Sequence, residues 1–140
     1  MKILIAVDGS EYTRKMLNYV TTHEGMFGKD NDYTLLTVQL PLPPRARSAV
    51  GSEIVKSYYA DEVEKVMAPA VKFLGKRGIE AAPAWKVGTP GEVISKFATD
   101  NNFDLIIMGS HGHGALGNLV MGSVATQVVA HCRVPLLIVR

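Results

Sequence analysis

The sequence predicts an α/β protein built on an open, five-stranded parallel sheet with helices on both faces. Short apolar runs alternate with longer segments whose apolar residues repeat about every 3.6 positions, the pattern of parallel strands joined by crossover helices. Glycine, proline and polar turn residues mark the boundaries between these segments. The chain has 140 residues, 47% of them hydrophobic, and a chain of this size buries about 68 to 70% of its unfolded surface. We therefore expect one domain over residues 1–140.

The N-terminal part contains two predicted strands and the first helix. Residues 3–7 are expected to form the first strand and residues 33–38 the second. Between them, Ser10 offers a capping hydroxyl and Glu11 a first-turn acid, which together predict the start of a helix. Residues 40–51 contain three prolines, so we expect an irregular, mobile loop there.

The remaining elements continue the alternation. They are a long helix over 55–74, a strand over 80–87, a helix from 90, a strand over 104–108, a helix over 123–131 and a last strand over 135–139. Pro69 predicts a kink in the long helix. Thr89 and Glu92 have the spacing of a capping box, with Pro90 at the first helical position. No helix follows the last strand, which is therefore expected to be an exposed sheet edge.

Composition excludes several classes of protein. The net charge is +2, with no run of lysine and arginine and few aromatic residues, so nucleic acid is not expected as a partner. The single cysteine, Cys132, cannot form an intrachain disulfide and suits a reducing compartment. The continuous apolar run directly before Asp8 has five residues, too few for a signal peptide, and no apolar run has the length of a membrane span. We expect a cytoplasmic protein.

A glycine-rich loop is the feature that points most directly to a ligand. Five glycines occur between Gly109 and Gly122, directly after an apolar strand and before a helix. Such a loop directs several backbone N–H groups to one place, as in phosphate-binding sites. If the first and fourth strands are neighbours, the turn at residues 8–10 meets this loop at the carboxyl end of the sheet. The loop is therefore predicted to hold an anion.

Two common phosphate-binding motifs match this loop only by accident. Gly112, Gly114 and Gly117 satisfy G-x-G-x-x-G, but a dinucleotide site needs an acidic residue about 20 positions later, and no Asp or Glu follows Asp104. Gly117 and Gly122 have Walker A spacing, but Ser123 occupies the lysine position. Neither motif is therefore favoured.

The spacing Gly109, two residues, Gly112, nine residues, Gly122-Ser123 resembles the ATP-binding branch of the universal stress protein family. The similarity extends along the chain. It includes the opening K-I-L-I-A-V-D-G-S, the second strand L-L-T-V, the turn V-G-T-P-G-E-V-I, the segment D-L-I-I-M-G-S-H-G and the closing V-P-L-L-I-V. The resemblance implies a homodimeric, Rossmann-like nucleotide-binding fold with strand order 3-2-1-4-5 and ATP across strands one and four.

The resemblance also implies a role for each matching residue. Ala6 and Asp8 would approach the adenosine half, Val38 the adenine, and Met108 with Gly109 the base and ribose, while Gly112, Gly122, Ser123 and Val124 would hold the phosphates. The homodimer would form through the edge strand Leu136–Val139. Ala125 replaces a frequent second hydroxyl, and histidines at 111 and 113 replace residues that are often cationic or polar. Magnesium or backbone dipoles would then neutralise the phosphates.

Catalysis has less support than binding. Phosphoryl transfer usually needs a cationic stabiliser, and the loop contains no lysine or arginine. His111 and His113 lack a third metal ligand at suitable spacing, so no metal bound directly by the protein is expected. We favour a nucleotide-dependent stress-response or signalling module with a partner protein still to be identified. The alternatives are an interaction protein of the same fold that binds no nucleotide, and a slow ATPase or autophosphorylating form.

Overall fold

The computed structural model describes residues 1–114 and 120–140. Its centre is a five-stranded parallel sheet in the order β3-β2-β1-β4-β5. The strands are β1 (Lys2–Ala6), β2 (Asp32–Gln39), β3 (Ala81–Val87), β4 (Leu105–Gly109) and β5 (Leu136–Val139). The predicted fold class and strand order are confirmed, and most strand boundaries differ from the prediction by one residue. Gly117, one of the five glycines, lies outside the described residues.

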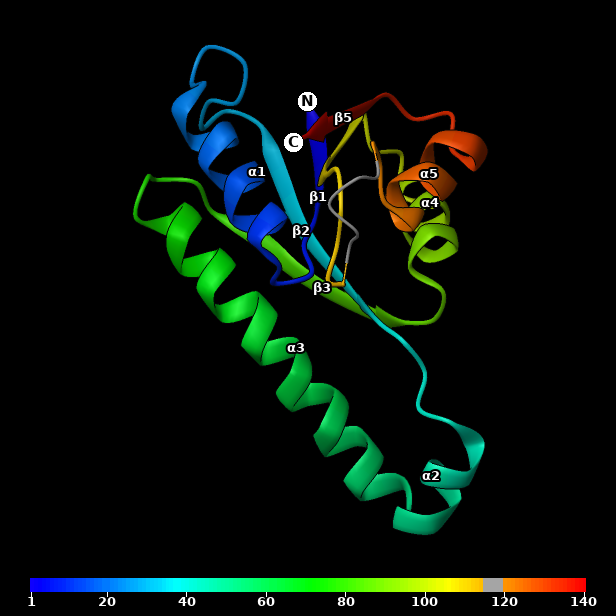
Figure 1. Cartoon of the computed structure of the whole chain (residues 1–140). Coiled ribbons are helices and arrows are strands. Elements are labelled where there is room, and N and C mark those ends of the chain that lie inside the picture. The colour runs from blue at the N-terminus through cyan, green and yellow to red at the C-terminus, as the bar shows by residue number, and fades with distance from the viewer. Residues whose placement is uncertain (115–119) are drawn as a thin grey trace.

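Helices cover both faces of the sheet, as expected. The helices are α1 (Glu11–Thr22), α2 (Pro44–Val50), α3 (Ser52–Gly75), α4 (Pro90–Asp100) and α5 (Ser123–His131). Figure 1 shows α1 and α3 on one face and α4 and α5 on the other. Ser10 caps α1, because its hydroxyl accepts a hydrogen bond from the Thr13 N–H at 3.4 Å. The start predicted for this helix is therefore correct.

Two apolar cores hold the layers together, one on each face of the sheet. Alternate residues of β1 point to opposite sides, so Ile3 and Ile5 pack with α1 and α3, whereas Leu4 and Ala6 pack with α4 and α5. Ile3, Leu4 and Ile5 have no exposed surface. Burial on both faces explains why β1 and β4 contain continuous apolar runs rather than alternating ones.

The sheet order brings the carboxyl ends of β1 and β4 together. Ile5 of β1 pairs with Ile107 of β4, while Ala6 pairs with Leu36 of β2. The chain leaves β1 towards β2 on one side and reaches β4 on the other, so strand order reverses at this point. Ligands of open α/β sheets bind in the crevice formed there.

The segment after β2 differs from the prediction. Residues 44–50 form the helix α2, whereas an irregular loop was expected over 40–51. Pro44 occupies the first turn of α2, where a missing N–H costs nothing. The prolines therefore precede the helix or start it, and the expectation of an irregular loop is wrong for these residues.

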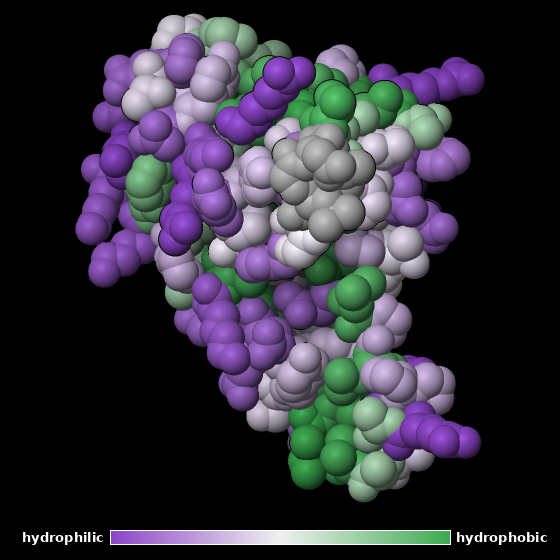
Figure 2. Space-filling model, viewed as in Figure 1, coloured by the Kyte–Doolittle hydropathy of each residue, from purple (hydrophilic) through white to green (hydrophobic). Residues whose placement is uncertain are grey.

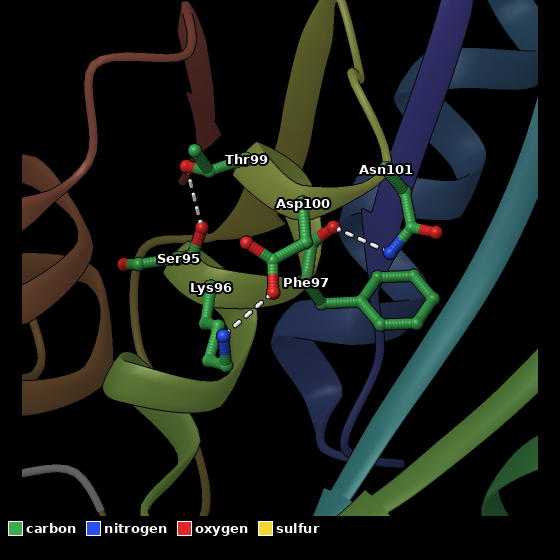
Figure 3. A network of polar contacts seen from close by, with 6 residues as sticks. All are labelled: Ser95, Lys96, Phe97, Thr99, Asp100 and Asn101. Carbon is green, nitrogen blue, oxygen red and sulfur yellow. Dashed lines mark hydrogen bonds and ion pairs between the residues drawn. The ribbon is translucent and has the colours of Figure 1, made fainter.

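The start of α4 also differs in detail. The helix begins at Pro90, as predicted, but the Thr89 side chain makes no capping hydrogen bond, so the predicted capping box is not formed. Proline at the first position already fixes φ for the helix. The other end of α4 carries the polar contacts in Figure 3, where Lys96 pairs with Asp100 at 2.7 Å and the Asn101 side chain donates to the Phe97 carbonyl at 2.9 Å.

The N-terminal part of α3, together with α2, projects beyond the sheet (Figure 1). Apolar side chains gather over this projection in Figure 2. Val50 at the end of α2, and Ile54 and Tyr58 in the first turns of α3, are exposed. Across the described part of the chain, no helix combines the length and the apolar character that crossing a membrane requires.

Candidate functional site

A cavity of about 480 Å³ opens at the carboxyl ends of β1, β2 and β4. This volume is within the usual range for small-molecule sites, about 300 to 1,000 Å³. All the residues to which the sequence assigned a ligand role lie along its wall: Ala6, Asp8, Val38, Met108, Gly109, Gly112, Gly122, Ser123 and Val124. Tertiary structure thus brings together residues from opposite ends of the chain. Their contact with a ligand stays a prediction.

One end of the cavity is apolar. Ala6 and Leu36 come from neighbouring strands, and Met108 comes from β4. Val38 near the end of β2 and Ile94 on α4 complete this part. These side chains form an apolar surface that offers few hydrogen bonds.

Asp8 lies where β1 ends, and its carboxylate has two different surroundings. Its Oδ1 accepts hydrogen bonds from the Ser10 N–H at 2.9 Å and the Thr13 hydroxyl at 2.8 Å, and its own N–H donates to Thr13 Oγ1 at 3.0 Å. These bonds hold the turn in one conformation. Its Oδ2 faces the glycine-rich loop, since a Cβ built on Gly112 would lie 2.8 Å from it. Asp8 is therefore both a turn residue and a wall of the cavity.

The glycine-rich loop is closed at its base by a backbone hydrogen bond. The N–H of Gly122 donates to the carbonyl oxygen of Ser110 at 2.7 Å. A Cβ on Gly122 would lie 3.1 Å from the His111 Cα and 3.3 Å from that carbonyl. A side chain there would press on backbone atoms, which cannot move without opening the loop. Glycine at 122 is thus required by close approach.

The N-terminus of α5 opens into the polar end of the cavity. The first bond within the helix runs from the Thr126 N–H to the Gly122 carbonyl at 3.0 Å, so the N–H groups of Ser123, Val124 and Ala125 have no acceptor within the helix. All three residues line the cavity, and the N-cap residue Gly122 has no side chain with which to cap them. Unsatisfied N–H groups and the positive end of the helix dipole favour an anion here.

Two histidines stand beside this polar end. The Nε2 of His113 lies 2.7 Å from the Asp8 carbonyl oxygen, so its ring links the glycine-rich loop to the end of β1. The Nδ1 of His111 lies 2.8 Å from the Ser110 hydroxyl, and its ring is 4.9 Å from that of Tyr12. Both histidines line the cavity.

Sequence reasoning missed several residues of the wall. Thr13 could have been found, because a hydroxyl residue five positions after a turn aspartate can bond back to it. Pro90 and Ile94 gave no such signal, because they reach the cavity only through the packing of α4. The histidines were noted as replacing more usual residues, but their bond partners could not be predicted.

Comparison with known proteins identifies the family. A model of the universal stress protein family matches residues 1–140. The chain belongs to this family. A universal stress protein of Thermus aquaticus is 32% identical over 99% of this chain and 97% of its own length. Universal stress protein Slr1230 of Synechocystis is 29% identical, and the chain spans 42% of that longer protein.

Solved structures of universal stress proteins have the same fold. The structure of MJ0577, a universal stress protein of Methanocaldococcus jannaschii, superposes with a TM-score of 0.80 at 31% identity, covering 99% of this chain and 94% of the other. A universal stress protein of Archaeoglobus fulgidus in complex with dAMP has a TM-score of 0.68 at 22% identity, covering 100% and 98%. Two further structures with this fold, 19% and 18% identical, were solved with cAMP and with AMP. Three proteins with this fold have therefore been solved with an adenine nucleotide bound.

Proposed function

We propose that this universal stress protein binds ATP in the cavity at the carboxyl ends of β1, β2 and β4. The observation that carries the proposal is the arrangement of two unlike ends in one cavity. An apolar pocket lies at one end, and the uncapped N-terminus of α5 with the glycine-rich loop lies at the other. A nucleotide has the same two-part character, with a flat apolar base and a charged phosphate chain.

The adenosine half would lie between the strand ends and α4. Ala6, Val38 and Met108 would enclose the adenine, with Ile94 behind it. Asp8 and Gly109 would lie beside the ribose. The Asp8 Oδ1 is engaged by Ser10 and Thr13, and a carboxylate held in this way meets a ligand hydroxyl without losing side-chain freedom on binding.

The phosphate chain would lie on the glycine-rich loop and the start of α5. Gly112 and Gly122 permit close approach of backbone N–H groups, and Ser123 adds a hydroxyl donor. Val124 would contribute its N–H. We expect Mg²⁺ to accompany ATP and to be held by the phosphates, because the cavity wall formed by the described residues has no lysine or arginine.

The family resemblance and the two edges of the sheet support an expectation about location, dimerisation and signalling. We expect a cytoplasmic homodimer formed through β5, whose sequence L-L-I-V has neither proline nor charge. The opposite edge strand, β3, contains Pro83 and Lys86, which are features that protect an edge from pairing. ATP occupancy would change loop order or dimer state and so signal to a partner protein.

The test is a calorimetric titration of the purified protein with ATP and Mg²⁺, after ultraviolet absorbance has shown that no nucleotide was carried through purification. We expect micromolar affinity, and at least about tenfold weaker binding in Gly122→Val. Gly25→Ala is the matched control, because a Cβ at Gly25 meets nothing within 4 Å. Absence of heat at two temperatures would favour the interaction protein without nucleotide. ADP release in the same samples would reveal slow hydrolysis.

A further inference from the structure

The charges around the proposed nucleotide site are unusual for a phosphate-binding cavity. Among the described residues that line it, the ionisable side chains are Asp8, His111 and His113. No lysine or arginine occurs anywhere between Asp104 and Arg133 in the sequence, so the whole glycine-rich loop lacks a permanent cation. A bound phosphate chain would meet backbone dipoles, one carboxylate and two imidazoles.

His113 is placed to supply the missing positive charge. Its Nε2 faces the Asp8 carbonyl oxygen at 2.7 Å, and because a carbonyl can only accept, Nε2 must donate a hydrogen. The second nitrogen, Nδ1, is then the atom that gains a proton when the ring becomes cationic. Protonation keeps the bond to Asp8 and strengthens it. The side chain is exposed.

The ionisable groups around His113 come from the end of β1, from α1 and from α3. A second, smaller hollow beside the cavity is lined by His113, Glu11 and Tyr12. Glu11 is ion-paired with Lys15 at 3.1 Å. On the α3 side, the side chain nearest to Gly9 is the apolar Val66. Glu62, one helical turn before Val66, forms an ion pair with Lys65.

Asp8 and His111 are the remaining ionisable neighbours, and Asp8 faces the loop through Oδ2. A phosphate bound in this cavity would bring negative charge to the same wall. Negative charge close to an imidazole stabilises the imidazolium. Histidine is also the side chain that normally changes charge between about pH 5 and 8.

We infer that His113 is the residue that neutralises phosphate charge in this site, and that nucleotide binding takes up a proton at its Nδ1. Binding is then coupled to pH, with affinity highest in mildly acidic solution and lower as pH rises. This inference rests on the proposed nucleotide site. It gives a nucleotide-binding stress protein a response to cytoplasmic acidification that a lysine at position 113 would not provide.

Calorimetric titration with ATP and Mg²⁺ from pH 6 to pH 8.5, in two buffers of different ionisation enthalpy, measures both affinity and proton uptake. For the wild-type protein we expect about tenfold weaker binding at pH 8 than at pH 6 and net proton uptake. His113→Gln should bind weakly at pH 6 and vary less with pH. His113→Lys should bind tightly across the range. His131→Gln, in the last turn of α5 and away from the cavity wall, should behave as wild type.

Comparing the variants isolates the contribution of His113, because the terminal phosphate of ATP exchanges the same number of protons with the buffer whichever variant is titrated. Adenosine, which has no phosphate, is expected to bind without the His113-dependent proton uptake. Equal affinity and equal proton uptake in wild type and His113→Gln would overturn the inference while leaving the nucleotide site intact. No binding by the wild-type protein at any pH would overturn the proposed function and this inference together.

Discussion

The N–H of Gly122 donates to the carbonyl oxygen of Ser110 across 2.7 Å, and the N–H of Ser110 donates in turn to Val139 of β5 at 2.8 Å. These two bonds fix both ends of the glycine-rich loop to the sheet. The first bond also fixes the residue at which α5 begins. The position of the phosphate end of the proposed site therefore depends on these backbone contacts.

Gly112→Ala tests the contact between this loop and Asp8. The new Cβ would lie 2.8 Å from Asp8 Oδ2, and the carboxylate cannot rotate away without losing its bonds to Ser10 and Thr13. We expect about tenfold weaker ATP binding, or about 1.4 kcal/mol, with the fold retained. Calorimetry and circular dichroism measure the two effects. Unchanged affinity would show that the loop adapts and that this approach is not needed.

Thr13→Val tests the turn that holds Asp8. The variant removes the acceptor of the Asp8 N–H and one donor to Oδ1, and a typical intramolecular hydrogen bond contributes about 0.5 to 1.5 kcal/mol. Urea denaturation should show a loss of that size. Thr22→Val is the control, because the Thr22 hydroxyl bonds only at the exposed end of α1. Similar losses in both variants would contradict a special role for Thr13.

Alkaline pH should destabilise the protein through Tyr33. Burial raises the pKa of the Tyr33 phenol above its ordinary value of 10.0, and a hydrogen bond from Asn31 offsets part of this effect. The folded state therefore keeps its proton to higher pH than the unfolded state does. The resulting stability is fully present below pH 10 and is lost as pH rises through the folded-state pKa.

Thermal unfolding between pH 9 and pH 11.5 measures this decline. Tyr33→Phe should flatten it, although the variant starts less stable because it loses the 2.9 Å bond to the Gly28 carbonyl. Tyr58→Phe, at an exposed position, should retain the wild-type slope. An unchanged slope in Tyr33→Phe would assign the alkaline transition to other groups.

The edge of β5 can be tested with two proline variants. The carbonyls of Pro135 and Val139 accept bonds from β4. Because backbone groups alternate along a strand, Leu137 also faces β4, while Ile138 points its N–H to the free edge. Ile138→Pro should therefore give folded monomers by light scattering, and Leu137→Pro should instead lower the thermal midpoint. A dimeric Ile138→Pro protein would place the interface elsewhere.

The sequence by itself determined the order and type of most elements and the composition of the proposed site. Its continuous apolar runs reflect strands buried on both faces, and its helical segments carry their own start signals, as at Ser10. The predictions that were wrong concern segments in which two local signals conflict. Prolines near residue 44 suggested a loop, although proline in the first turn suits a helix.

Only the tertiary structure decided which groups meet in the cavity. His113 bonds to the carbonyl of Asp8 across a separation of 105 residues, and Ile94 reaches the same wall through the packing of α4. Spacing along a chain specifies local backbone geometry, whereas contacts between distant loops depend on the order in which parallel strands are placed. That order sets β1 beside β4, so it also sets the site.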